Sequence, residues 1–119
     1  MSLNGIWALE IANVYGWNRV GTVFLEKGRY LGASADFFSQ GSYTSKGKQV
    51  KMQLNVTHHG SSDMAVFGEK SKCFAVEFEG KYKKDTIRGQ SKLKGAHSRV
   101  ATQSVRFLKL EKIKKHKKA

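Results

Sequence analysis

The sequence contains no proline and only one cysteine, Cys73. A single cysteine cannot form an internal disulfide, so nothing in the sequence points to an oxidising compartment. No run of residues approaches the roughly 18 to 20 apolar residues that a membrane-spanning helix needs. Residues 1–13 also lack the basic segment and apolar run of a secretory signal. We therefore expect a soluble, cytoplasmic protein.

Acidic residues are scarce, since nine Asp and Glu accompany 22 Lys and Arg, for a formal charge of +13. Apolar residues still make up 39% of the 119-residue chain, which is enough for one folded core. We predict a single domain over residues 1–111, followed by a basic tail over residues 112–119. The excess positive charge raises the question of an anionic partner.

Hydrophobic periodicity indicates β-strands. Over residues 49–59 polar side chains alternate with mostly apolar ones, which is the pattern of a strand with one wet and one dry face. The same alternation covers residues 72–78 and the segment around residues 7–11. The twelve glycines favour turns and bulges over helices, because glycine destabilises a helix interior by about 1 kcal/mol.

Short polar segments separate the expected strands. Residues 26–29 and 45–48 are predicted hairpin turns in which glycine adopts a positive φ, and a further hairpin is predicted through residues 81–84. Residues 59–71 and 92–101 are expected to be looser connections. The other expected strands cover residues 19–25, 30–33, 37–44, 86–91 and 103–110. About eight short strands without a convincing helix predict an all-β fold, an antiparallel barrel or sandwich, of which a closed, up-and-down β-barrel is the favoured form.

Closure of the sheet covers its apolar face and removes exposed edges. Gly21, Gly41 and Gly89 lie inside expected strands, where they suit the strong curvature of a closed sheet. The interior of an eight-stranded barrel is filled by side chains or holds one small ligand. We expect it to be either a packed core or a small apolar binding pocket, lined by Trp7, Leu9, Val23, Tyr43, Met52, Leu54, Phe74, Val76 and Phe78.

Glycine and aromatic spacings also suggest a family. They comprise Asn4-Gly5-Ile6-Trp7, the strand around Gly21, the stretch from Lys27-Gly28 to Asp36, and Phe38-Ser39-Gln40-Gly41. This pattern resembles the GrlR-type negative regulators of type III secretion, which are small lipocalin-like β-barrel proteins.

The resemblance implies a regulator that acts by protein–protein contact. In the family, a loop corresponding to residues 45–49 can carry an acidic run that engages a transcriptional activator. Here that loop is basic, and the resemblance places Lys46 and Lys48 at the partner-binding position.

No arrangement of residues predicts catalysis or metal binding. Cys73 belongs to an alternating strand and is interpreted as a small, half-buried residue rather than a nucleophile. His58 and His59 are adjacent, so in a strand they point to opposite faces and cannot both ligate one metal without distortion. Glu77 and Glu79 lie on one strand face and are expected to point to solvent. We expect neither an enzyme nor a bound metal or cofactor.

The alternative function is an anion-binding or nucleic-acid-binding module. Residues 109–118 contain six lysines and one glutamate, and such a basic segment binds nucleic acid non-specifically by counterion release. Stacking on an aromatic side chain would add to that attraction. The predicted anion-binding residues are Lys81, Tyr82, Lys83, Lys84, Lys112, Lys114 and Lys115. Apolar stripes on small barrels also often pair, so a homodimer is a further expectation.

Overall fold

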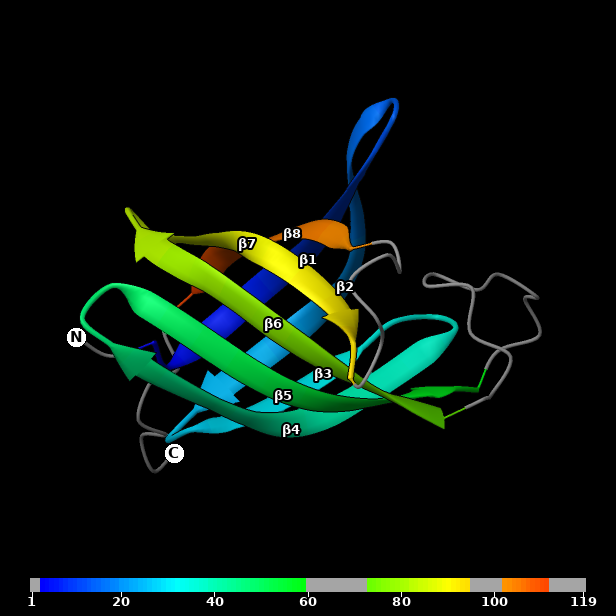
Figure 1. Ribbon diagram of the computed structural model, residues 1–119, viewed down its shortest axis with the longest axis horizontal. Coiled ribbons are helices and arrows are strands. Elements are labelled where there is room, and N and C mark those ends of the chain that lie inside the picture. The colour runs from blue at the N-terminus through cyan, green and yellow to red at the C-terminus, as the bar shows by residue number, and fades with distance from the viewer. Residues whose placement is uncertain (1–2, 60–72, 95–101, 112–119) are drawn as a thin grey trace, which may run out of the picture.

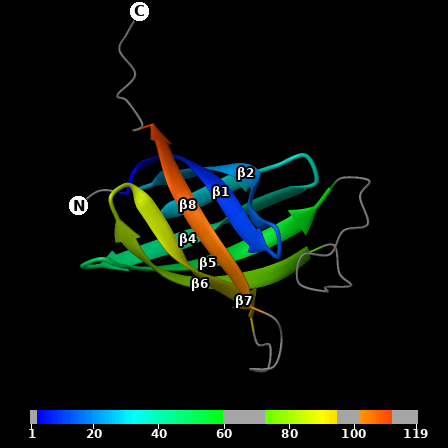
Figure 2. The same ribbon diagram turned by 90° about the horizontal axis from the view of Figure 1, so that it is seen from above.

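In the computed structural model the chain forms a closed barrel of eight antiparallel strands (Figure 1). The structure describes residues 3–59, 73–94 and 102–111, and these contain no helix. Each strand pairs with the next, and β8 lies beside β1 to close the barrel (Figure 2). The predicted all-β, up-and-down antiparallel barrel is confirmed. The strands are β1 Gly5–Asn13, β2 Gly16–Glu26, β3 Arg29–Ala33, β4 Phe37–Lys46, β5 Gln49–His58, β6 Cys73–Lys83, β7 Thr86–Leu93 and β8 Gln103–Glu111.

Several strands run further than the apolar alternation indicated, because backbone pairing continues past the last buried side chain. β6 extends to Lys83, so its hairpin turns at Lys84 and Asp85 rather than over residues 81–84. Both of these residues adopt a positive φ without glycine, at 49° and 60°. The predicted tail with Lys112, Lys114 and Lys115 lies outside the described residues, as do most of the connections expected at 59–71 and 92–101.

The two glycine turns occur where they were predicted. The β2–β3 turn places Lys27 and Gly28 at φ values of 50° and 82°, and the β4–β5 turn places Gly47 at 60°. In the β2–β3 turn, positive φ at both central residues matches the right-handed twist of the flanking strands. Lysine therefore occupies an exposed turn position that glycine or asparagine usually fills.

Two strand glycines allow neighbouring backbones to approach closely. A Cβ added at Gly41 would collide with the carbonyl of Gln53 on β5, and one added at Gly89 would collide with the carbonyl of Glu79 on β6. No side chain fits at either position unless the strands move apart. These glycines allow the strong local curvature that the closed sheet needs, as predicted.

The barrel interior is packed solid at the end that carries the β2–β3, β4–β5 and β6–β7 turns. Trp7 is fully buried there, and its indole Nε1 donates a hydrogen bond to the carbonyl of Leu3, at 3.0 Å. The Tyr82 ring meets the Trp7 ring edge-on at 6.2 Å. The Lys109 ammonium lies 5.4 Å from the centroid of the indole. We call this half of the barrel the closed end.

Candidate functional site

The other half of the interior is hollow. A cavity of about 310 Å³ extends from the middle of the barrel to the β3–β4 connection. Apolar side chains of β1, β5, β6 and β8 form most of its wall, and this volume lies within the range of small-molecule sites. The inward-facing residues of the wall are Leu9, Ile11, Tyr30, Leu54, Val56, Phe74, Val76, Ser91, Val105 and Phe107.

The nine residues predicted to line the interior divide between the two halves. Leu9, Leu54, Phe74 and Val76 line the cavity, whereas Trp7, Val23, Tyr43, Met52 and Phe78 belong to the packed core or lie against it. The sequence left a packed core and an apolar pocket as alternatives, and the structure contains both. Four of the nine predicted residues thus line the cavity, and the other five support the closed end.

Phe107 forms the floor between the two halves. Its ring lines the cavity and meets two buried rings edge-on, Phe78 at 5.3 Å and Tyr30 at 6.1 Å. Tyr30 also lines the cavity, and burial raises the pKa of its hydroxyl far above the usual value, a shift that a hydrogen bond with Ser39 only partly opposes. The hydroxyl is thus a neutral polar group in an apolar wall.

The mouth of the cavity is built by the turn after β3. The Ser34 hydroxyl holds this turn through two hydrogen bonds with Phe37. It accepts one from the Phe37 amide at 3.2 Å and donates one to the Phe37 carbonyl at 3.3 Å. The Phe37 ring then lies 4.8 Å from the ring of His58 and 6.5 Å from that of Phe74. Phe37 and Phe74 line the cavity at its open side, and His58 packs beside Phe37. Within the described residues, the buried Nε2 of His58 has no hydrogen-bond partner.

The histidines and Cys73 of the described ranges do not come together in one group. His58 packs against Phe37, whereas His59 packs against Phe38, so the two histidines face opposite sides as predicted. No group of three metal-ligating side chains occurs in the described ranges. Cys73 is exposed rather than half-buried, because it begins β6 on the outer face, where its Sγ lies 3.8 Å from the hydroxyl of Thr57.

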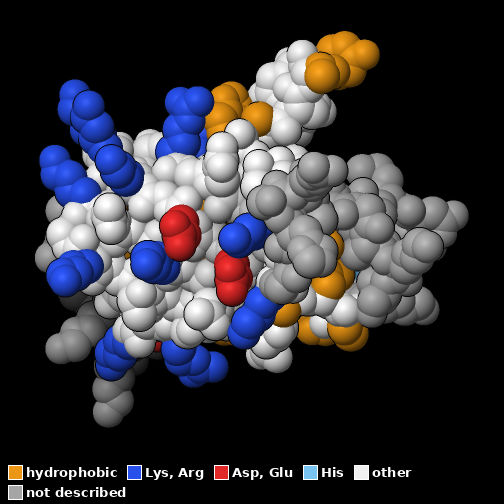
Figure 3. Space-filling model, viewed as in Figure 1, with side chains coloured by type: hydrophobic (Ala, Val, Ile, Leu, Met, Phe, Trp, Pro, Cys, Tyr) orange, Lys and Arg blue, Asp and Glu red, His pale blue; other side chains and the backbone are white. Residues whose placement is uncertain are grey.

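The predicted surface lysines gather around the closed end. Lys46 and Lys48 belong to the β4–β5 hairpin, and Lys83 and Lys84 belong to the β6–β7 hairpin at the same end. All four are exposed. Basic side chains gather over this side of the molecule (Figure 3). The structure therefore brings together two sets of lysines that the sequence analysis assigned to a partner site and an anion site.

Tyr82 does not belong to that lysine surface. Alternation along β6 turns Tyr82 toward the interior, against Trp7, while Lys81 and Lys83 point outward. Its hydroxyl donates a hydrogen bond to the Asp85 carboxylate at 3.1 Å. The Tyr82 ring therefore packs against the core and is not displayed on the face that carries Lys81 and Lys83.

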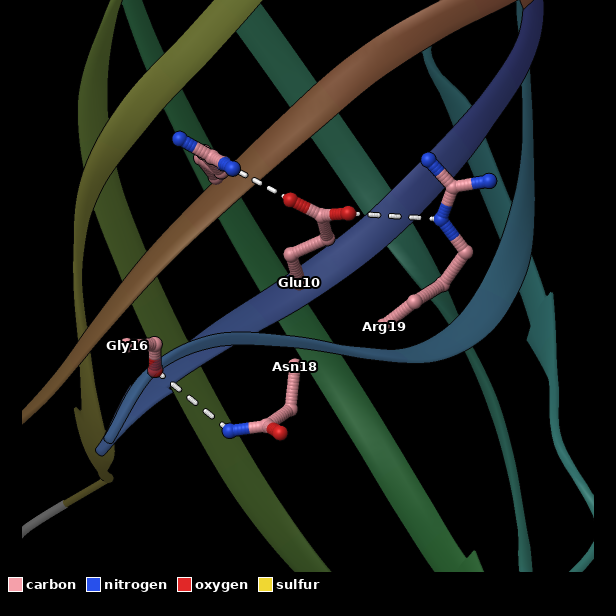
Figure 4. A network of polar contacts seen from close by, with 5 residues as sticks. Glu10, Gly16, Asn18 and Arg19 are labelled. Carbon is pink, nitrogen blue, oxygen red and sulfur yellow. Dashed lines mark hydrogen bonds and ion pairs between the residues drawn. The ribbon is translucent and has the colours of Figure 1, made fainter. Parts of the chain in front are cut away.

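A different polar cluster lies on the outer wall and was missed by the sequence analysis. The Glu10 carboxylate, only 8% exposed, accepts hydrogen bonds from Nε of Arg106 at 2.7 Å and from Nε of Arg19 at 3.3 Å (Figure 4). The bond from Arg106 is the main reason that the pKa of Glu10 is lowered. The guanidinium of Arg106 also lies 4.4 Å from the ring centroid of Trp17.

Comparison with known proteins gives no match, either to a protein-family model or to a curated protein. Among the described residues, no helix is long and apolar enough to cross a membrane. Function must therefore be inferred from the cavity and from the outer surface of the barrel.

Proposed function

We propose that this protein is a non-enzymatic binding protein that takes up a small apolar ligand in the hollow half of its barrel. The observation that carries the proposal is the contrast between the two halves of one interior. Protein cores contain few voids larger than a water molecule, and the closed end follows that rule. The open half instead keeps about 310 Å³ free behind an aromatic mouth.

The wall of the cavity selects for a neutral ligand. Among the described residues that line it there is no Lys, Arg or His, and the one carboxyl group, that of Asp36, lies at the β3–β4 connection. A buried carboxylate or phosphate on the ligand would therefore lose its hydration without gaining a cation. The hydroxyls of Tyr30 and Ser91 can hydrogen-bond one polar atom. The favoured ligand is an apolar molecule with a single neutral hydrogen-bonding group.

We infer a regulatory role from the resemblance to GrlR-type regulators. Contact with a protein partner is supported by exposed residues on the surface of the barrel, including Lys46 and Lys48 at the β4–β5 turn. The charge of this turn favours an acidic partner. Ligand uptake at the open end and partner contact at the closed end would use opposite ends of the same barrel.

Ligand uptake is tested with a neutral fluorescent probe, N-phenyl-1-naphthylamine, because an anionic dye would be attracted by the charge of +13. The wild-type protein should bind the probe saturably, and dodecanol should displace it. Dodecanoate should displace it less effectively, because the described part of the wall offers no cation to its carboxylate.

A matched pair of variants locates the probe. Leu54 lines the cavity, whereas Leu31 is 44% exposed on the outer face. Leu54→Trp should lower the affinity for the probe at least tenfold by occupying the cavity, and Leu31→Trp should leave it unchanged. Circular dichroism confirms that both variants are folded. Equal affinity in the wild type and Leu54→Trp, or no saturable binding by the wild type, would contradict the proposal.

A further inference from the structure

Two of the four arginines in the described ranges lie over the ring of Trp17 on the outer wall, and a third, Arg19, shares the carboxylate of Glu10 with one of them. The guanidinium carbons of Arg106 and Arg88 lie 4.4 Å and 5.3 Å from the ring centroid of Trp17. Arg88 is directly opposite Arg106 in the β7–β8 pairing, and Arg106 is opposite Glu10 in the β1–β8 pairing. Glu10 in turn is opposite Arg19 on β2. We call Arg19, Arg88, Arg106 and Trp17 the arginine cluster.

The buried carboxylate of Glu10 fixes the direction of two of these guanidinium groups. Arg106 and Arg19 each bind Glu10 through Nε, and neither makes another hydrogen bond with a described residue. Their terminal amino groups therefore remain available as donors. Such a planar, pre-oriented fork suits phosphate oxygens better than a flexible lysine does.

The charge of the cluster is not neutralised by its own carboxylate. Three arginines face one glutamate, and the exposed Lys81 lies opposite Arg88 in the β6–β7 pairing. Each neighbouring strand is about 4.8 Å away, so the cations follow one another across the wall at short intervals. A linear polyanion matches this arrangement better than a single ion.

An exposed aromatic ring stands at the tip of the same hairpin. Tyr15 is 94% exposed and lies two residues from Trp17, and the tip projects away from the barrel body (Figures 1 and 3). The Tyr15 amide donates a hydrogen bond to the side-chain oxygen of Asn13, at 2.8 Å, which holds the turn that presents the ring. A base can stack on such a ring only when its face is free, as it is in a single strand.

We propose that the arginine cluster and Tyr15 form a binding site for single-stranded nucleic acid. The guanidinium groups contact successive phosphates, and Tyr15 stacks on an unpaired base. Glu10 is a positioning residue that orients Arg19 and Arg106. This site lies on the outer wall and is independent of the cavity, so Leu54→Trp should retain it.

The first test measures fluorescence anisotropy of a labelled 12-nucleotide oligo-dT at near-physiological salt. Arg88→Ala is compared with Arg29→Ala, which removes the same charge from β3, away from the cluster. Arg88→Ala should weaken binding and lower the salt slope by about 0.7, because one phosphate is no longer neutralised, and Arg29→Ala should do neither. Tyr15→Ala should weaken binding roughly tenfold, whereas Val14→Ala at the same tip should not.

The second test distinguishes diffuse electrostatic attraction of the oligonucleotide from binding by oriented guanidinium groups. Glu10→Gln raises the net charge from +13 to +14, so a diffuse attraction predicts tighter binding. The proposal predicts weaker binding, because Arg19 and Arg106 lose the carboxylate that directs them. Arg106→Lys keeps the charge and leaves Glu10 intact, and it should also weaken binding. Thermal melting verifies that both variants are folded, and Arg106→Lys alone decides the question if Glu10→Gln does not fold.

Three results would overturn the proposal. Equal losses of affinity for Arg88→Ala and Arg29→Ala, or no loss for Arg106→Lys, would show a diffuse attraction. Equal affinity for a duplex of the same length would exclude stacking on an unpaired base. Binding to anionic vesicles that depends on Tyr15, without binding to oligo-dT, would identify the tip as a membrane contact instead.

Discussion

The hollow and packed halves of the barrel predict opposite effects of the same substitution. Val76 is 4% exposed and lines the cavity, whereas Val23 is fully buried in the packed half. Valine and isoleucine are both β-branched and differ by one methylene group, so strand preference changes little between them. The Val76→Ile and Val23→Ile variants therefore compare free space at two inward-facing positions of one barrel.

The magnitudes follow from the space available to the added methylene. At Val76 it enters the cavity and buries apolar surface, which stabilises the fold by about 0.8 kcal/mol. At Val23 it meets close-packed neighbours, and overpacking costs about 1 to 3 kcal/mol. The free energies of unfolding should thus differ by roughly 2 to 4 kcal/mol between the two variants, with Val76→Ile above the wild type and Val23→Ile below it.

Urea denaturation followed by tryptophan fluorescence measures this difference, with unchanged m-values showing that the unfolding transition is comparable. Val76→Ile should also weaken binding of the neutral probe, because the methylene takes up part of the cavity. Destabilisation of similar size by both substitutions would show that the open half is as tightly packed as the closed end, and the reasoning would fail.

Two further predictions concern the close approach of β6 and β7 at Gly89 and the buried hydroxyl of Tyr30. Gly89→Ala should destabilise the barrel by about 3 kcal/mol in the same denaturation assay, because its Cβ would collide with the Glu79 carbonyl. Ser42→Ala, on the outer face of β4, should have little effect. Equal effects of the two substitutions would refute the close approach of the backbones at Gly89. Burial raises the pKa of Tyr30, so the stability that its neutral hydroxyl contributes is fully present below the ordinary tyrosine pKa of 10.0. Above pH 10.0 the free energy of unfolding of the wild type should fall by up to about 1.4 kcal/mol per pH unit. Tyr30→Phe should remove this loss between pH 10 and 11, and an identical pH dependence in both proteins would contradict it.

The strand alternation and the two glycine turns were sufficient to predict the class of fold. They depend on neighbours within a few residues, as in the alternation along β5 and the turn at Lys27 and Gly28, so the sequence displays them directly. Alternation also predicts the orientation of Tyr82, because in a strand Tyr82 points to the face opposite that of its neighbours Lys81 and Lys83. Nearness in sequence therefore does not place the Tyr82 ring on the face of the two lysines beside it.

The division of the interior into two halves could not be predicted from alternation. Alternation tells which side chains point inward, but not their height along the barrel axis, which depends on strand register and tilt. Met52 and Leu54 are two residues apart on one strand face, yet Met52 is core and Leu54 lines the cavity. Neighbouring inward positions of one strand, both in the buried core, can thus differ in whether they border free space.

The arginine cluster on the outer surface likewise could not be predicted from a local sequence pattern. Glu10 and Arg106 are separated by 96 residues and meet only because β8 closes on β1. Trp17 and Arg88 likewise come together through pairings that no local pattern encodes. Strands, turns and an excess of positive charge could be predicted from the chain alone, since each is a local or additive property. Closure of the barrel determines which charges and rings are neighbours, because contact between distant strands depends on a register that the whole chain sets together.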